Sequence, residues 1–507
     1  MKKIATVLFL ALWAAALCFP LVVRRVLVPA GLIRYSAFYV KGEQRNPAPR
    51  PSVLKSSPQR VAWSELGRGF EAWYNDAFPW RSEVLRFHRR FSFEHLKTPI
   101  GREVPGYGNW IFLRGDGWGE LDDYLGAFEL TDGELADWVA LFEGHREWAR
   151  AIGSVFLTLP APVKCQVCWR KMYPALRSHR GRNVATQVRD ALEGSPARED
   201  VLFANDDFAA ALAAGREVFF DSDHHPCAYG QWLLYDRLNR RLAELFPGRV
   251  DAHLPWYDNP PQAVRDGLEP GCWPSGEGDQ SDTSKEIRLE VSFPGEVRDY
   301  DGVPQGPQPY PYSHVATRRQ GGGISILFAH DSYMRFTLSS WKRGADDSVR
   351  LPFSKGVGNV RAFIFYRFSP GSLESLTTES IPDVIIEQFP ECRLDGSAHR
   401  YCKYNIRAAA VFARAAEPDA GRPLRKGDRI AARAVLEDVR SVGNGTSAAV
   451  LTCGGKELRR RTVSAGVRRA VFFDAVDVPE GDLALTLESC TAAATNLSWR
   501  LIVPDSI

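Results

Sequence analysis

The sequence lacks an excess of either charge, an internal repeat and a second pair of metal ligands. Its 64 basic residues stand against 61 acidic ones, a net charge of +3, and this balance does not suggest nucleic acid as a partner. No segment recurs, which argues against a repeat array. Cys165 and Cys168 form a lone C-x-x-C, whereas a zinc site would need two further ligands at a suitable spacing. We therefore expect no metal ion and no cofactor, and interpret this pair as a disulfide or two buried thiols.

Long apolar runs are also missing, with one exception at the start of the chain. Residues 4–23 are apolar, with two lysines before them and two arginines after them. The run is just long enough to span a bilayer, and no convincing cleavage site follows it. We predict an uncleaved signal anchor over residues 1–25 and a tether rich in proline and charge over 26–61. The body of the protein is then expected in the periplasm, attached to the inner membrane.

Eight cysteines follow the predicted anchor. An even number in an exported chain suggests disulfides, although the sequence does not fix the pairing. Cys392 with Cys402, and Cys453 with Cys490, are near enough along the chain to form local bridges.

Residues 62–398 alternate between two kinds of pattern. Apolar residues at helical spacing predict helices over 63–93 and 135–148. Short β-like runs occur at 154–159, 201–204, 218–221, 324–329 and 362–366. Strands that alternate with helices indicate an α/β sheet flanked by helices. A stretch rich in Pro and Gly, residues 258–323, interrupts this rhythm and is typical of a lid or the wall of a substrate groove.

The last part of the chain, residues 399–507, differs in character. It contains several short β-rich runs, the first of them at 406–414, separated by turn residues. This spacing predicts a β-sandwich.

One apolar strand stops abruptly at a serine. Residues 324–329 are apolar and lead through His330 and Asp331 to Ser332. A strand-to-helix turn presents a serine hydroxyl at the carboxyl edge of a sheet, where backbone N–H groups can hold an oxyanion. The alternative is that Asp331 or Ser332 merely caps a helix.

A second strand end supplies a candidate base. The run Phe219-Phe220 is followed by Asp-Ser-Asp-His-His, which includes Asp223 and His225, in a chain with only 10 histidines. In a serine triad the histidine removes the hydroxyl proton and a carboxylate orients the imidazole. A metal cluster or a surface loop is the alternative.

The two motifs, in this order, resemble those of the SGNH-hydrolase-like polysaccharide O-acetyltransferases of alginate acetylation, the AlgX and AlgJ type. Further resemblance over about residues 62–393 lies in Asp76–Arg81, Gly108–Leu113, Lys164 with Met172-Tyr173-Pro174, the pair Tyr366-Arg367, and Pro382–Glu387. The resemblance implies an SGNH-hydrolase-like catalytic domain over 62–398 and a module like the carbohydrate-binding module of AlgX over 399–507.

By the same resemblance, Ser332 is the nucleophile, His225 the base and Asp223 its orienting carboxylate. The chain departs from the family at two positions. Pro226 stands where a tryptophan is usual, which affects the shape of the pocket, and His330 stands where a glycine is common. We expect His330 to fill space.

Three further residues are expected to contact the substrate. Asp331 and Tyr333 flank the serine, and Asp331 could also orient the turn or lend a backbone N–H to an oxyanion hole. Arg367 could steer a uronate carboxylate by a bidentate contact. Structural roles are equally consistent with the sequence for Asp331 and Arg367.

The expected function is transfer of an acetyl group through an acyl-serine to the hydroxyls of an exported polysaccharide, anionic or neutral. A membrane-bound acyltransferase would supply the acetyl group. An acetyl esterase with the same triad and a non-catalytic polysaccharide-binding scaffold are the alternatives. A basic cluster at residues 456–469 could attract an anionic polymer, although such runs are commonly solvated faces, and Trp499 is expected in the core.

Overall fold

The computed structural model describes most of the chain after residue 102. The described ranges are 103–108, 110–114, 119–221, 224–250, 296–299, 313–317, 323–334, 358–364, 380–396, 398, 404–419, 422–443 and 445–503, with scattered positions among the first hundred residues. The chain divides into two compact units, residues 1–100 with 267–280 and the remainder. No helix among the described residues is both long and apolar enough to cross a membrane. Most of the predicted anchor and helix 63–93, and all of the tether beyond residue 30, lie outside the described residues.

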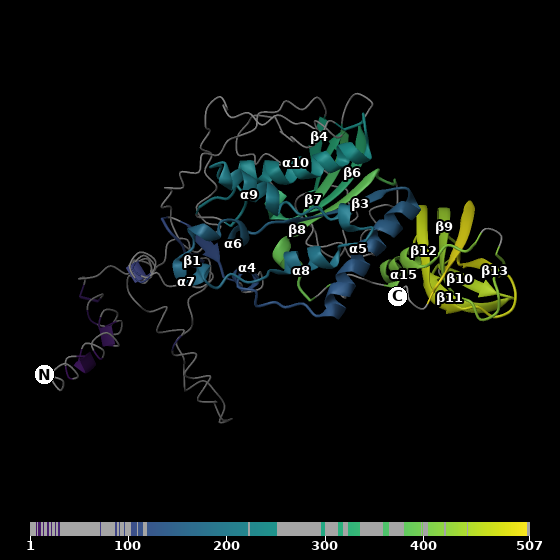
Figure 1. The fold of residues 1–507 in the computed structure, drawn as a ribbon, viewed down its shortest axis with the longest axis horizontal. Helices are drawn as coiled ribbons and strands as arrows, with labels where there is room; N and C mark the ends of the chain where they lie inside the picture. The colour runs from purple at the N-terminus through teal and green to yellow at the C-terminus, as the bar shows by residue number, and fades with distance from the viewer. Residues whose placement is uncertain are drawn as a thin grey trace. The chain divides into compact units, whose positions relative to one another are not determined.

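A six-stranded sheet forms the centre of the second unit (Figure 1). Its order is β3 (Val155–Ala161), β8 (Val384–Pro390), β6 (Ile324–His330), β7 (Gly358–Ile364), β5 (Ser313–Thr317) and β4 (Glu296–Asp299). The first four strands are parallel, and β5 and β4 are antiparallel to their neighbours. The predicted α/β sheet is confirmed, as are strands near 154–159, 324–329 and 362–366.

Two predicted strands reduce to single bridges. Val201 forms one parallel bridge with Thr158, and Phe219 forms one antiparallel bridge with Pro226. Neither run is long enough to form a strand. Helix 205–213 begins directly after the run that contains Val201, and the chain reverses direction directly after the run that contains Phe219.

Both faces of the parallel strands are buried, which explains their continuous apolar runs. On β6, Ile326 and Phe328 belong to one apolar cluster, whereas Leu327 and Ala329 belong to a second on the opposite face. Figure 1 shows the helices on the two sides. The first cluster includes residues of α9 (Asn205–Ala213) and α10 (Ala228–Leu245); the second includes residues of α5 (Asp132–Ile152) and α8 (Val184–Ala191).

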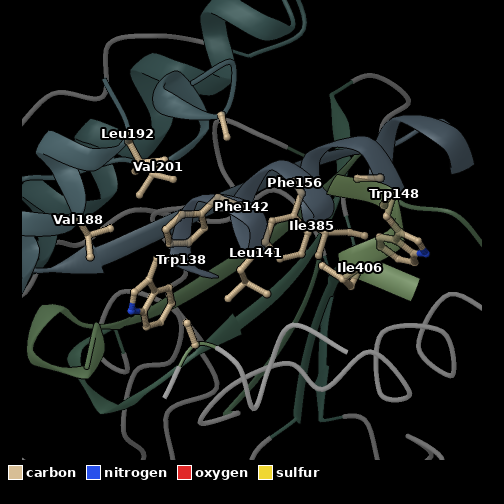
Figure 2. Packing of buried hydrophobic residues seen from close by; sticks show 14 of the residues in the cluster. Trp138, Leu141, Phe142, Trp148, Phe156, Val188, Leu192, Val201, Ile385 and Ile406 are labelled. Carbon is tan, nitrogen blue, oxygen red and sulfur yellow. The ribbon is translucent and has the colours of Figure 1, made fainter. Parts of the chain in front are cut away.

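Helix α5 confirms the helix predicted over 135–148 and begins at a capping box. Thr131 accepts the backbone N–H of Glu134, whose carboxylate accepts the backbone N–H of Thr131. Such reciprocal bonds satisfy N–H groups that the first turn leaves without partners. Gly153 ends the helix at φ 85°, a conformation that glycine adopts at little cost. Figure 2 shows the aromatic side chains of α5 packed against Phe156 of β3 and Ile385 of β8.

Residues 404–414 form helix α15 (Tyr404–Arg414), so the β-rich run predicted at 406–414 is wrong. Ile406, Ala409 and Phe412 are buried at intervals of three, which places them on one side of a helix. Alanine, the commonest residue in this run, is also the strongest helix former. Ile406, Ala408, Ala410 and Phe412 also fit the period of two of a strand, so the run matches both patterns.

The end of the chain forms two antiparallel sheets. One contains β9 (Arg429–Ser441), with β12 (Gly466–Asp477) and β15 (Ala494–Leu501) on either side of it and the short β14 (Cys490–Thr491) at its end. The other contains β11 (Lys456–Thr462), β10 (Ala448–Cys453) and β13 (Leu483–Glu488). Residues from both sheets share a core, and Trp499 packs against it as predicted.

The sheet of β9 and β12 is buried on both faces. Val471 and Phe473 of β12 lie in the core between the two sheets. The intervening Ala470 and Phe472 lie instead in the apolar cluster that contains α5 and α15. Asn405 of α15 donates to the carbonyl of Ala470 at 3.0 Å and accepts the N–H of Phe472 at 2.9 Å. Helix α15 therefore joins the sandwich to the part that contains the six-stranded sheet, through a continuous apolar core.

This junction makes Gly144 sensitive to substitution. A Cβ at Gly144 would overlap the backbone carbonyl of Ile406 in α15. We expect Gly144→Ala to lower the free energy of unfolding by about 2–3 kcal/mol, because backbone on both sides resists a shift. Gly133→Ala in the same helix is the matched control, since the nearest atom to its Cβ would lie 4.0 Å away. It should be neutral or stabilising by up to about 1 kcal/mol. Urea unfolding of the full chain measures both, and equal effects would contradict the close packing of α5 and α15.

The predicted bridges of Cys392 and of Cys453 with Cys490 are wrong, because all three thiols are free. The Cys490 thiol lies 3.8 Å from the carbonyl oxygen of Ala448, at the start of β10, whereas Cys453 ends that strand. At about 3.3 Å per residue the two cysteines are separated by about 17 Å. A disulfide cannot span that distance. Cys165 and Cys168 are free and buried, which is one of the two interpretations given above.

Candidate functional site

Residues 331–334, called the serine turn below, lie at the carboxyl end of β6. This is a central strand with parallel neighbours on both sides. The geometry of the serine turn is fixed by Asp331, whose Oδ1 accepts the backbone N–H of Tyr333 at 2.8 Å. The backbone N–H of Asp331 in turn donates to Gln388 on β8 at 3.1 Å. Ser332 opens a short 3-10 helix, Ser332–Met334, between these two anchored residues. Its backbone is thus placed as predicted, and its side chain lies outside the described part.

His330 contributes to this turn. It is 1% exposed, and its Nδ1 lies 2.7 Å from the carbonyl oxygen of Asp331. A carbonyl can only accept, so this contact requires the tautomer with the proton on Nδ1. The ring therefore supports the backbone beside the serine in addition to filling space.

The histidine motif occupies a tight reversal of the chain. Phe219 pairs with Pro226, and the N–H of Cys227 donates to the carbonyl of Val218 at 3.1 Å. Within this reversal the N–H of Phe220 donates to the carbonyl of His225 at 3.4 Å. We call residues 218–227 the histidine hairpin. Pro226 stands where the family that the motifs resemble usually has a tryptophan. Its ring fixes the backbone angle φ, which favours the reversal of the chain.

The structure brings this hairpin to the serine turn. The ring of His225 lies 5.6 Å from that of Tyr333, the residue after Ser332, and the ring of His224 lies 5.9 Å from it. The two histidine rings are 3.9 Å apart. Two motifs more than a hundred positions apart in the sequence are therefore neighbours at the carboxyl edge of the sheet.

Two predicted site residues cannot be placed. Asp223, two positions before His225, and Arg367, three positions after the end of β7, lie outside the described residues. Their roles stay predictions. Asp331 and Tyr333 are each only 1% exposed, and their polar groups engage the protein itself. Direct contact of these two with substrate also stays a prediction, and the bonds described here give both a supporting role in the turn.

A buried carboxyl that the sequence did not reveal lies beneath the serine turn. Glu120, the first residue of α4 (Glu120–Tyr124), has no exposed surface, and its Oε1 accepts the hydroxyl of Tyr333 at 3.2 Å. Burial raises its pKa to about 7. Burial likewise raises the pKa of Asp331 to about 6. Glu391 follows β8 and accepts hydrogen bonds from Val163 and Asn205. Burial raises the pKa of Glu391 to about 8.

The charge of Lys164 is also buried close to the site. Lys164 has no exposed surface, and its ammonium donates to the carbonyls of Ile111 and Asp221 at 2.7 Å each. The N–H of Ile111 donates to the same Asp221 carbonyl at 2.8 Å. Asp221 lies in the histidine hairpin, four residues before His225. Lys164 and strand β2 (Ile111–Leu113) therefore fix the base of this hairpin.

The raised pKa of Glu120 has a measurable consequence. The folded protein favours the protonated carboxyl, so this stabilising contribution is complete below about pH 4.5 and is lost as the pH rises through about 7. In Glu120→Gln the side chain is neutral at every pH. We expect the free energy of unfolding of the variant, minus that of the wild type, to increase by about 2 kcal/mol between about pH 5 and about pH 8. Urea unfolding at both pH values tests this, since other titrating groups cancel in the difference. A constant difference would contradict an ionisation of Glu120 in this range.

The basic cluster predicted on the sandwich is largely compensated by acidic side chains. Arg460 pairs with Glu457 and Glu488. Arg461 pairs with Asp474 at 2.7 Å. Weaker pairs join Arg459 to Asp474 and Arg468 to Glu437, and Arg469 is buried with its guanidinium bonded to backbone carbonyls. Most of this cluster is thus a set of cross-strand ion pairs. In the part of the chain described, no group of three or more His, Cys, Asp or Glu side chains could hold a metal ion.

Comparison with known proteins gives similarity to solved structures alone. No family model matches the chain, and no curated protein matches it. The O-acetyltransferase domain of Pseudomonas putida AlgJ is 16% identical over 58% of this chain and 92% of its own, with a TM-score of 0.32. Pseudomonas aeruginosa AlgX is 12% identical over 77% and 94%, with a TM-score of 0.30. Bacillus cereus PatB1 is 10% identical over 58% and 98%, with a TM-score of 0.33. At such identities and TM-scores these similarities assign no role to any residue of this chain.

Proposed function

We propose that this protein is an acyltransferase in which Ser332 takes an acetyl group from a donor and passes it to a hydroxyl of a polysaccharide. His225 acts as the general base, and Asp223 orients its imidazole. The observation that supports the proposal best is the 5.6 Å separation between the rings of His225 and Tyr333 at the carboxyl end of β6. It puts a titratable imidazole beside the turn that carries the serine, as nucleophilic catalysis requires.

Each step needs a group in a defined place. The imidazole of His225 removes the hydroxyl proton while the serine oxygen attacks the acetyl carbonyl. The leaving group of the donor takes the proton back, and an acetyl-serine remains. The acceptor hydroxyl then attacks this ester, with the same imidazole as base, and Ser332 is released with its proton. Backbone N–H groups of the 3-10 turn after Ser332 are candidates for the oxyanion site.

The choice of acetyl and of a polysaccharide acceptor follows the collinear motifs that resemble polysaccharide O-acetyltransferases. A water molecule in place of the acceptor would make the same site an esterase. The proposed membrane-bound donor partner and the periplasmic, membrane-attached location accompany this proposal.

The test is direct detection of the intermediate. The full-length protein is treated with a simple acetyl ester and digested, and mass spectrometry searches for acetyl on Ser332. A second sample receives candidate glycans before the quench. Acetyl on Ser332 that disappears as acetylated glycan forms supports transfer, whereas free acetate as the sole product supports an esterase. An unmodified Ser332 with no ester turnover would favour the non-catalytic scaffold.

A further inference from the structure

A surface rich in aromatic and basic side chains lies beside the histidine hairpin. It is formed by the turn between β1 (Glu103–Pro105) and β2, by the 3-10 helix Trp169–Lys171, and by the region of α7 (Pro174–Arg177). We call it the aromatic–basic surface; its members are Tyr107, Trp110, Trp169, Tyr173, Arg170, Lys171, Arg177 and Arg180.

The rings on this surface are held in place by cations and by one another. Tyr107 and Tyr173 meet edge to face at 4.9 Å, and Arg177 lies 5.6 Å from the ring of Tyr107. Two guanidinium groups, those of Arg170 and Arg180, lie 4.9 and 5.2 Å from the ring of Trp169. Cation–π contacts of this kind position the rings without neutralising the cations.

The turn that carries Tyr107 is fixed to the neighbouring 3-10 helix. The backbone N–H of Tyr107 donates to the carbonyl of Lys171 at 2.8 Å. A Cβ at Gly106 would lie 2.6 Å from the same carbonyl, so glycine permits this approach. The ammonium of Lys171 lies 5.4 Å from the ring of Trp110. The surface is therefore built before any ligand arrives, which lowers the entropic cost of binding.

The cations of this surface differ from those of the sandwich. None of the ion pairs among the described residues includes Arg170, Lys171, Arg177 or Arg180. Arg170, Lys171 and Arg180 are exposed, and Arg177 is half-buried. On β11, by contrast, Arg459, Arg460 and Arg461 each have a carboxylate partner. Among the described residues, these four cations thus form a group beside the candidate site without a carboxylate partner.

The surface is also continuous with the candidate active site. The ring of Trp110 lies 4.8 Å from the ammonium of Lys164, which holds the Asp221 carbonyl of the histidine hairpin. The next residue, Ile111, donates to the same carbonyl. A polymer bound against Trp110 would therefore lie next to residues that hold the histidine hairpin, which carries His225.

We propose that the aromatic–basic surface binds the acceptor of the proposed transfer reaction, and that this acceptor is an acidic glycan. This inference rests on the proposed function. Aromatic rings stack on the apolar faces of sugar rings, and guanidinium and ammonium groups bind carboxylates. An anionic membrane surface fits less well. Of these aromatic side chains, Tyr107 alone is strongly exposed, at 43%, and among the residues described between 103 and 250 no large aliphatic side chain is exposed.

The test measures binding by the full-length protein with Ser332→Ala as background, so that turnover does not interfere. The probe is an oligogalacturonate, with a cello-oligosaccharide of equal length as the neutral counterpart and phosphatidylglycerol vesicles as the anionic membrane. One variant combines Lys171→Ala, Arg177→Ala and Arg180→Ala. The matched control combines Lys456→Ala, Arg459→Ala and Arg460→Ala on β11. Circular dichroism and the melting temperature confirm that both variants are folded.

We expect the surface variant to bind oligogalacturonate at least about tenfold more weakly and with a smaller dependence on salt, because three charged contacts are lost. The β11 variant should bind within about twofold of the parent, since its arginines are already paired. Equal losses in both variants, unchanged binding in the surface variant, no binding by the parent, or a response limited to the vesicles would each overturn the proposal. Hydrolysis of a small ester by the wild type tests the proposed function independently.

Discussion

Ser332→Ala and His225→Ala are each expected to lower turnover of a small acetyl ester by several orders of magnitude. A serine hydroxyl is a weak nucleophile near neutral pH unless a base removes its proton. Combining the two substitutions should cost little more than either alone, because the residues act as a unit. Steady-state hydrolysis of a chromogenic acetyl ester measures all three variants.

The adjacent histidine provides a sharp control. The rings of His224 and His225 lie at similar distances from Tyr333, so His224→Ala makes an equivalent change one position away. It should retain most of the activity. Ser464→Ala, an exposed serine in the sandwich, controls for the loss of a hydroxyl. If His224→Ala were inactive and His225→Ala active, the base would be His224, and full activity of folded Ser332→Ala would remove the mechanism altogether.

The second large effect is expected at Lys164. Lys164→Met keeps the length of the side chain but leaves the carbonyls of Ile111 and Asp221 without the ammonium that bonds both. We expect the free energy of unfolding to fall by about 3 kcal/mol, because buried acceptors lose a charged donor. The histidine hairpin would also shift, and a displacement of about 1 Å at a catalytic base costs about a hundredfold in rate.

Stability and catalysis can be separated in this experiment. At a temperature where Lys164→Met is fully folded, kcat for a small ester should fall while KM changes little, since the hairpin and not the ester site is disturbed. Lys426→Met, at an exposed turn of the sandwich, is the control and should change neither quantity. A folded Lys164→Met with wild-type kcat would show that Asp221 is held in place without the lysine.

The sequence predicted the parts of the fold that depend on local pattern. The apolar run before Ser332 and the helical spacing after Leu135 both have single interpretations, and both elements are present. The run at 406–414 failed because its apolar residues fit two periods, and contact with α5 and β12 selects the helix. The pairing of Cys453 with Cys490 failed because the two residues lie at opposite ends of β10, which spacing along the chain does not reveal.

The candidate site was predictable to the extent that each motif follows an apolar run. Ser332 follows β6, and the carboxyl end of a strand in a parallel sheet is a common place for a functional residue. The run before His225 forms only a single antiparallel bridge, so its approach to Tyr333 depends on tertiary structure. Glu120 carries no such signal, since an acidic residue at the start of a helix usually faces water. Lys164 was singled out by resemblance alone. Its sequence does hint at a buried position, because it closely follows the apolar strand β3 and has no other charged residue nearby. Its bond to Asp221 depends on tertiary structure and could not be deduced.

Helix α15 makes the C-terminal sandwich difficult to exchange as a cassette. A domain on a flexible linker can be removed or replaced without exposing a core. Here, however, the second face of the sheet of β9 and β12 is covered by α15, which in turn packs on α5. A graft that started after α15 would expose Ala470 and Phe472 to water, and one that started before it would expose Ile406 and Phe412. The amides of α15 should accordingly exchange with deuterium only when both halves open together. A recombination event that preserved folding would have to carry a matching surface of α5 along with the module.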